Sequence, residues 1–439
     1  MTARRGLTRR ELHRGLLSLL ALAGCRAGGP SPNPGPLVGA SARPRRTGPR
    51  KLLHINLGGG SDVLYSLDPK EPREVAPGIG PVFPSDQLLT RGEVRLAPNW
   101  APLARHLDRM QVIRGIQCST VAHQTGCIQT RQLRRDVVSA SAESAVAVMA
   151  RALTPEAPVD CVQLGNGDGT FSSGGRSLAD SKLGSMLEQL LGLANNAAVR
   201  DAALGELAAA GRAAGSSAEP LRAATHLLVA MQGKSRPSPP ALDALPALDL
   251  ASLPLPAWFP RQRFLGYTTR QALQLEWALF VLQHDLAPSV YLESTYLWDT
   301  HVENSLQDPQ STCFAALLAH LIDRLPEIRT PDGTPLADQL GLIVTSGELG
   351  RFPYTNAQRG KDHFPQIAAL LLGPGLRPGG FGETDRELTA TPVSLATGRP
   401  GRGGSLLTLD DLGRTLLEWA GVPAADLGYG GRILEFAFA

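Results

Sequence analysis

Three short polar clusters in the last third of the chain contain the side chains that bind divalent metal ions. Imidazole and carboxylate groups are ligands for borderline and hard ions. The clusters contribute Asp299 and His301, then Glu348, then Asp362 and His363. Each of these residues alone is more often a turn former or a solvated charge, but their recurrence over a short stretch predicts a metal site.

Regular elements precede two of these clusters. Residues 286–292 and 341–346 are apolar runs typical of buried strands, and 311–325 has apolar residues at the helical period. A strand, a helix and a second strand in this order predict a right-handed crossover in a parallel sheet. Ligands of such sheets bind beyond the carboxyl ends of the strands, where the first cluster and Glu348 would lie. We therefore expect an α/β fold with a mostly parallel sheet.

Two basic residues near the clusters have alternative roles. Arg351 and Lys361 are potential ion-pair partners for Glu348 and Asp362. Arg351 is also a candidate to neutralise an oxygen of an anionic substrate.

The sequence motifs of these clusters resemble those of a known family. The strings are Trp298-Asp-Thr-His301-x-x-Asn304, Gly347-Glu-Leu-Gly-Arg351-x-Pro353, Lys361-Asp-His-Phe-Pro365 and Gly373-Pro-Gly-x-x-Pro-Gly-Gly380. They resemble the exported bacterial family called domain of unknown function 1501, which is similar to the alkaline-phosphatase and sulfatase superfamily. The resemblance is specific from about residue 260 onward and weaker over 50–135. It implies a three-layer α/β/α sandwich and a metal site, but no particular substrate.

The first strand of the domain is expected at 52–57. It ends in three glycines followed by Ser61 and Asp62, where glycine lets the backbone turn sharply and approach a ligand. An ordinary turn explains this pattern as well. In the superfamily the first strand ends in a metal-binding carboxylate, so the resemblance makes Asp62 a candidate ligand. The sequence departs from the family pattern here, which leaves Asp62 and Asp68 as alternatives.

A helix over 100–110 and a short strand at 112–113 lead to a second group of polar residues. The resemblance implies a nucleophile in this region, and the candidates are Cys118, Ser119 and Thr120. Residues 120–122 are Thr-Val-Ala, without the Pro and Arg of sulfatases, which argues against formylglycine chemistry. His123 is a candidate ligand or acid–base group, with a structural hydrogen-bonded histidine as the alternative.

The beginning of the chain has the features of an export signal. Arg9 and Arg10 precede the apolar run 16–23, which is too short to cross a bilayer, and Cys25 follows a lipoprotein-like cleavage sequence. We expect a twin-arginine lipoprotein signal over 1–25, so that the protein is exported, periplasmic or extracytoplasmic, and anchored to the membrane through a lipidated Cys25. An ordinary or uncleaved signal is the alternative.

The remaining segments set the domain organisation. Residues 26–50 are rich in Gly, Pro, Ser and Arg and predict a flexible tether. The domain is expected over 51–439, with a helical insertion at about 181–235 and a proline-rich connector at about 236–260. A helix is expected at 267–283, and Thr408 and Asp411 predict a capped helix that ends at Gly421. No transmembrane segment or internal repeat is visible in the sequence.

Charge and cysteine content narrow the function. The 43 basic and 40 acidic residues fall to 38 and 39 without residues 1–24, so nucleic acid is an unexpected partner. Four cysteines remain after Cys25 and permit disulfides in an oxidising compartment, but their spacing predicts no cysteine metal cluster. They are Cys118, Cys127, Cys161 and Cys313.

The leading hypothesis is an exported metal-dependent hydrolase of phosphate or sulfate esters. One or two ions of Zn, Mn, Mg or Ca would activate water or a hydroxyl nucleophile on a small anionic or polymeric substrate. The alternative is a lipid-anchored binding or scaffold protein with a structural ion, and a third reading is a carbohydrate-polymer partner. The expected ligands are Asp62, Asp299, His301, Glu348, Asp362 and His363, and the expected catalytic residues are Ser119, Thr120, His123 and Arg351.

Overall fold

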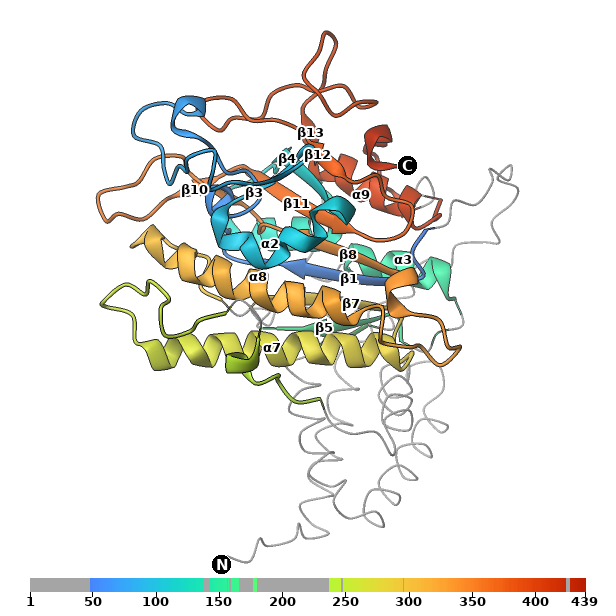
Figure 1. Ribbon diagram of the computed structural model, residues 1–439. Coiled ribbons are helices and arrows are strands. Elements are labelled where there is room, and N and C mark those ends of the chain that lie inside the picture. Colours follow the sequence, from blue (N-terminus) through green and yellow to red (C-terminus); the bar gives the residue numbers. More distant parts are fainter. Residues whose placement is uncertain are drawn as a thin grey trace, which may run out of the picture. The chain divides into compact units, whose positions relative to one another are not determined.

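A central mixed sheet organises the part of the chain that a computed structural model describes (Figure 1). The described residues are 48–136, 143–155, 157, 159–165, 177–179, 237–245, 248–294, 296–423 and 427–439. The expected signal, most of the tether and the helical insertion lie outside these residues. The described residues fall within one compact unit of the chain.

The sheet has nine strands within the described residues, in the order β12-β4-β11-β8-β1-β7-β5-β6, with β13 also paired to β4. The strands are β1 (Lys51–Asn56), β4 (Gln111–Gln117), β5 (Cys161–Leu164), β6 (Ser177–Ala179), β7 (Ser289–Glu293), β8 (Leu340–Thr345), β11 (Gln366–Leu372), β12 (Gly379–Phe381) and β13 (Leu407–Thr408). Only β11 runs antiparallel to its neighbours β4 and β8. The expected α/β fold with a mostly parallel sheet is confirmed.

The three central strands are buried along their whole length, as their apolar sequences predict. Every residue of β1, β7 and β8 is buried. Leu52 and Ile343 belong to the core cluster that also contains residues of α9. Successive residues of a strand point to opposite faces of the sheet, so Leu53, next to Leu52 in β1, faces the other side. Strands covered on both faces are typical of parallel sheets, whose strands are nearly continuous apolar runs.

Helices pack against the sheet in two groups. In the first group, α7 (Arg261–Gln283) packs against α8 (Gln307–Arg324) and against β7. In the second, α2 (His123–Gln132) contacts α3 (Ala145–Leu153) and α9 (Leu409–Trp419). The helices expected at 267–283 and 311–325 are therefore present, each with an earlier start.

Local sequence explains the kink of one further helix and the two ends of another. The helix expected at 100–110 is η3 (Pro98–Arg109), a 3-10 helix with a kink at Trp100. Prolines at 98 and 102 provide no amide hydrogen for regular α-helical bonds. In α9, Thr408 and Asp411 form the expected capping box, and Gly421 follows with a φ of 70°.

The sheet topology brings distant loops to one edge. The connection from β7 through α8 to β8 passes β1, so β1 lies between β7 and β8. The carboxyl ends of β1, β4, β7 and β8 therefore share an edge. Because β11 runs in the opposite direction, the residues just before it reach this same edge. Parallel sheets bind their ligands at this place.

Glycines allow the loops after β1 and β8 to meet backbone to backbone. Gly60 has a φ of 91° and Gly347 a φ of 134°, both in the region that favours glycine. A Cβ atom on Gly347 would lie 2.6 Å from the Cα atom of Gly60. A side chain at either position would therefore push the two loops apart.

Two small sheets lie outside the central one. One pairs β2 (Leu89–Arg91) with β3 (Val94–Leu96), and the other pairs β9 (Gly350–Arg351) with β10 (His363–Phe364). Among the described residues, no helix is both long and apolar enough to cross a membrane. The four cysteines within these residues form no disulfide with one another.

Candidate metal centre

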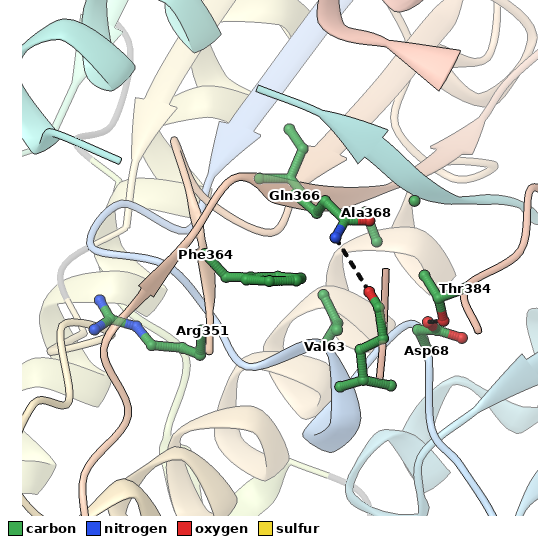
Figure 2. Close-up of a pocket in the computed structure, with 10 residues that line it drawn as sticks. Val63, Asp68, Arg351, Phe364, Gln366, Ala368 and Thr384 are labelled. Atoms are coloured by element: carbon green, nitrogen blue, oxygen red, sulfur yellow. Dashed lines mark hydrogen bonds between the residues drawn. The ribbon is translucent and has the colours of Figure 1, made fainter. Parts of the chain in front are cut away.

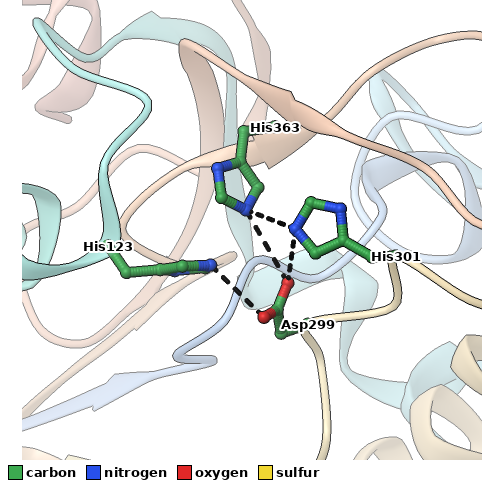
Figure 3. Close-up of side chains that lie close together, drawn as sticks. All are labelled: His123, Asp299, His301 and His363. Carbon is green, nitrogen blue, oxygen red and sulfur yellow. Dashed lines mark hydrogen bonds and ion pairs between the residues drawn. The ribbon is translucent and has the colours of Figure 1, made fainter.

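Four side chains from three separate segments meet at the shared edge of the sheet (Figure 3). His123 is the first residue of α2, Asp299 and His301 lie in the loop after β7, and His363 begins β10. One ligand atom from each of the four lies within 4.8 Å of the others. The sequence clusters around 299 and 363 therefore come together, and the more ambiguous His123 joins them.

Three of the four printed donor-atom distances lie near the spacing around a single divalent ion, and the fourth is shorter. The Nε2 atoms of His123, His301 and His363 lie 3.4, 3.3 and 3.7 Å from the Asp299 carboxylate oxygens. The Nε2 atoms of His301 and His363 are 2.7 Å apart. Ligand atoms of a tetrahedral zinc site, with bonds of about 2.0 Å, lie about 3.3 Å from one another. Three imidazoles and one carboxylate form a donor set of the zinc type, whereas calcium and magnesium prefer oxygen ligands.

Each imidazole has a hydrogen-bond partner on its other nitrogen. The Nδ1 pairs are His123 with Glu348 Oε1 (2.5 Å), His301 with Asp362 Oδ1 (3.0 Å) and His363 with the carbonyl oxygen of Val121 (2.6 Å). An Nδ1–H group that donates to such a partner leaves the Nε2 lone pair directed at the cluster. The three rings are thus oriented for ligation by groups outside the donor set.

Arg351 fixes the carboxylate of the cluster. Its Nη2 atom donates to Asp299 Oδ1 at 2.7 Å, and its Nε and Nη1 atoms donate to the carbonyl oxygens of Gly60 and Lys361. The side chain is fully buried. Arg351 therefore ties three loops together and pairs with Asp299 rather than with Glu348. Its expected contact with a substrate oxygen stays a prediction.

The surrounding charges shift the pKa values of the cluster. The hydrogen bonds that His123 donates to the carboxylates of Asp299 and Glu348 raise the pKa of His123 to about 9. Burial alone would raise the pKa of Asp299, but the hydrogen bonds from His123 and Arg351 outweigh it and hold that pKa below its usual value. Burial lowers the pKa of His363. The carboxylate is thus ionised and suited to a cation.

A second buried carboxyl group lies at the end of β7. Glu293 accepts hydrogen bonds from Asn56 Nδ2 at 2.9 Å and from the Tyr291 hydroxyl at 2.8 Å. Burial and the nearby charge of Glu348 raise the pKa of Glu293 to about 8. This carboxyl group is therefore mostly neutral at pH 7.

Asp62 lies outside the cluster, contrary to its expected role as a ligand. Its carboxylate forms an ion pair of 2.8 Å with Lys361, accepts a hydrogen bond from Asn304 and caps a short 3-10 helix through the Leu64 amide. The alternative, Asp68, is also buried and pairs with Lys70. The local sequence could not reveal Lys361 as the partner, because the two residues meet only through the sheet topology.

Glu348 and Asp362 lie beside the cluster. Their carboxylate oxygens accept hydrogen bonds from the Nδ1 atoms of His123 and His301 and are not among the four donor groups. The Glu348 carboxylate also accepts from the Gly59 amide at 2.9 Å. With Asp62 occupied by Lys361, the expected ligands for a second ion are already engaged. The four described side chains that meet here would provide donors for one ion, and a second ion stays a prediction.

The two candidate hydroxyl nucleophiles lie in the loop that enters α2. Ser119 Oγ donates to Gln129 Oε1 at 2.8 Å, and Thr120 Oγ1 accepts from the Ala122 amide at 3.0 Å. Neither is one of the four side chains that meet in the cluster. Burial raises the pKa of the Cys118 thiol to about 12, so this cysteine is a poor nucleophile.

Arg351 also lines a small cavity (Figure 2). Its volume is about 20 Å³, and its lining includes Val63, Asp68, Phe364 and Gln366. A cavity of this size holds about one water molecule. It is therefore too small for an organic substrate.

The fold and the site define an α/β protein with a candidate metal centre of three histidines and one aspartate. A sequence model of the family described as protein of unknown function DUF1501 matches residues 278–397. This match includes Asp299, His301 and His363 but not His123. One similar solved structure is that of a 2-O GAG sulfatase, with 13% identity and a TM-score of 0.33 over 88% of this chain and 73% of that chain. No curated protein matches the sequence.

Proposed function

We propose that the protein is an exported metal-dependent hydrolase of phosphate or sulfate esters. The observation that carries the proposal is the convergence of three imidazole Nε2 atoms and one carboxylate, each held by a partner outside the cluster. A divalent ion bound there would supply a Lewis acid that polarises an ester oxygen and lowers the pKa of water. Zinc fits the donor set best.

The residues around the cluster would prepare the site before substrate arrives. Glu348 and Asp362 hold two of the imidazoles, and Arg351 holds the carboxylate of Asp299. Such preorganisation limits the reorientation that catalysis requires. Water, Ser119 and Thr120 are the candidate nucleophiles, and the two hydroxyls lie in the loop just before His123.

The proposal extends to architecture and location. The packing of α7 on α8, and of α2 with α3 and α9, supports the three-layer α/β/α sandwich of alkaline-phosphatase-like enzymes. The paired arginines and Cys25 support export by the twin-arginine route and a lipid anchor. The substrate would then be a small or polymeric anionic ester outside the cytoplasm, and nucleic acid is not a proposed partner.

Elemental analysis of the purified full chain tests the metal centre. We expect about one zinc ion per chain, and its loss in the double variant His301→Ala/His363→Ala. The control is His320→Ala on α8, which removes a histidine outside the cluster and should retain the ion. Stoichiometric metal in the folded double variant would contradict the assignment.

A non-catalytic binding protein with a structural ion is the second candidate. It is favoured by the buried Arg351, which already donates within the protein from its Nε and both Nη atoms, and by the engaged hydroxyls of Ser119 and Thr120. Zinc-loaded protein should be assayed with aryl phosphates, phosphodiesters and aryl sulfates. Hydrolysis that disappears in the double variant supports the enzyme, whereas full zinc occupancy with no turnover supports the binding protein.

A further inference from the structure

The start of α7 carries a group of aromatic and basic side chains that contact one another. Trp258 is 52% exposed and packs edge-to-face on Phe259, with ring centroids 5.3 Å apart. The guanidinium group of Arg263 lies over the rings of Phe259 and Tyr267, 5.6 Å from each centroid. Arg270 is exposed and follows Arg263 by seven positions, on the same face of the helix. We call Trp258, Arg263, Tyr267 and Arg270 the α7 patch.

Arg263 is held in place but keeps most of its hydrogen-bond donors. Its Nε atom donates to the Tyr267 hydroxyl oxygen at 3.0 Å, and its two Nη groups bond to no residue that the structure describes. An open pair of Nη groups matches two oxygens of a carboxylate, sulfate or phosphate group. Because the rings and the hydroxyl already fix this side chain, little conformational freedom would be lost when it binds such an oxyanion.

The charge of the segment around the patch is positive. Residues 250–275 contain three arginines and no acidic residue. Asp249, which precedes this segment, accepts hydrogen bonds from the amides of Ala251 and Ser252 in its own turn. Arg263 and Arg270 form no ion pair with another described residue, and they are separated by about 10 Å along the helix axis. Two such cations suit anionic groups that repeat along a chain better than they suit a single ion.

Side-chain contacts connect the start of α7 with the loop that carries Asp299. The Tyr296 hydroxyl donates to Thr268 Oγ1 at 3.1 Å, and the ring of Tyr296 lies 6.1 Å from that of Phe264. Tyr296 also packs on Trp298, the residue before Asp299, with ring centroids 5.6 Å apart. The α7 patch therefore lies toward the same edge of the sheet as the metal centre.

We infer that the α7 patch binds an acidic polysaccharide whose anionic units continue the substrate beyond the ester at the metal centre. The Trp258 ring would stack on a sugar ring, and Arg263 and Arg270 would pair with oxyanions of successive units. The inference rests on the proposed function, because it takes this polymer as the substrate. One protruding tryptophan beside two arginines offers too little apolar surface to enter a bilayer, which favours a polymer over a membrane.

Binding of defined polymers to the full chain tests the patch without turnover. Calorimetry at low salt would compare polygalacturonate, poly-L-glutamate and dextran. The first two polymers carry carboxylates, whereas the first and the third carry sugar rings. We expect polygalacturonate to bind most tightly, with an affinity that falls as salt is raised, and dextran not to bind. Arg263→Gln should weaken the binding of both anionic polymers about tenfold. Trp258→Ala should weaken the binding of polygalacturonate alone, about fivefold.

The matched control is Arg402→Gln, which removes an exposed arginine from a different loop and should leave all affinities unchanged. Equal affinities for poly-L-glutamate and polygalacturonate, or unchanged affinities in the folded Arg263→Gln and Trp258→Ala variants, would overturn the inference but leave the metal centre intact. Trp258-dependent binding of phosphatidylglycerol vesicles in place of the polymers would also overturn it. Binding of polygalacturonate by a wild-type chain that holds no zinc would support the role of the patch and refute the proposed function.

Discussion

Replacement of Glu348 by glutamine should weaken zinc binding although all four ligand side chains remain. The Glu348 side chain is 1% exposed, so water cannot replace it. Its two oxygens accept hydrogen bonds from His123 Nδ1 and from the Gly59 amide. The Gly59 amide is shared between both Glu348 oxygens, so a glutamine oxygen at the Oε1 position could keep both bonds, but its NH2 group would then face the Gly59 N–H without an acceptor.

The magnitude follows from this mismatch. If His123 keeps its proton on Nδ1, one buried donor is left unsatisfied at a cost of about 1–3 kcal/mol. If the proton moves to Nε2, the nitrogen that faces Asp299 can no longer ligate. Because about 1.4 kcal/mol corresponds to a factor of ten, we expect zinc affinity to fall about tenfold to hundredfold, the usual cost of removing a ligand's hydrogen-bond partner.

Competition with a chromophoric chelator at pH 7 would measure this affinity, and circular dichroism would verify the fold. The control is Glu293→Gln. Glu293 is also a buried glutamate, but its raised pKa keeps it mostly neutral at pH 7 and it is not bonded to a cluster imidazole. A Glu348→Gln protein that is folded and binds zinc within twofold of the wild type would refute the orienting role.

Two further predictions concern pH. Because the pKa of His123 is raised to about 9 in the metal-free protein, zinc must displace a proton from this ring. Chelator competition should therefore show zinc affinity rising about tenfold per pH unit from pH 7 to 9. A zinc affinity that does not change with pH would contradict this prediction. The raised pKa of Glu293, about 8 against 4.5, means that its contribution to stability is complete below pH 4.5 and is lost as pH rises to 8. Between pH 4.5 and 8, urea unfolding of the metal-free wild type should show a loss of unfolding free energy that is smaller by up to about 5 kcal/mol in Glu293→Gln. Parallel pH profiles of the unfolding free energy in variant and wild type would contradict the raised pKa of Glu293.

The sequence predicts the elements around the site because their patterns are local. The apolar runs at β1, β7 and β8, the helical period of α8 and the capping box at Thr408 each need only a few neighbouring residues. The positions of Asp299 and His301 after β7 follow from the same reasoning. The kink in η3 arises from prolines whose effect the apolar period does not express.

The sequence could not predict which polar groups face each other. Asp62 and Glu348 both follow strands of the shared edge, but one meets Lys361 and the other meets His123. These choices depend on the position of β1 between β7 and β8 and on the reversed direction of β11. Residue type and spacing do not specify such pairings, which are settled by the packing of the whole sheet.

The distances along the chain between the interacting groups have a consequence for assembly. His123 and Glu348 are 225 residues apart, and Gly59 and Glu348 are 289 apart. Loop closure over such lengths has to precede these contacts. During synthesis, a nascent chain that does not yet include His363 lacks one of the four candidate ligands. An ion bound at this centre would therefore be acquired late, and the compartment in which the sheet closes would determine which metal the protein encounters first.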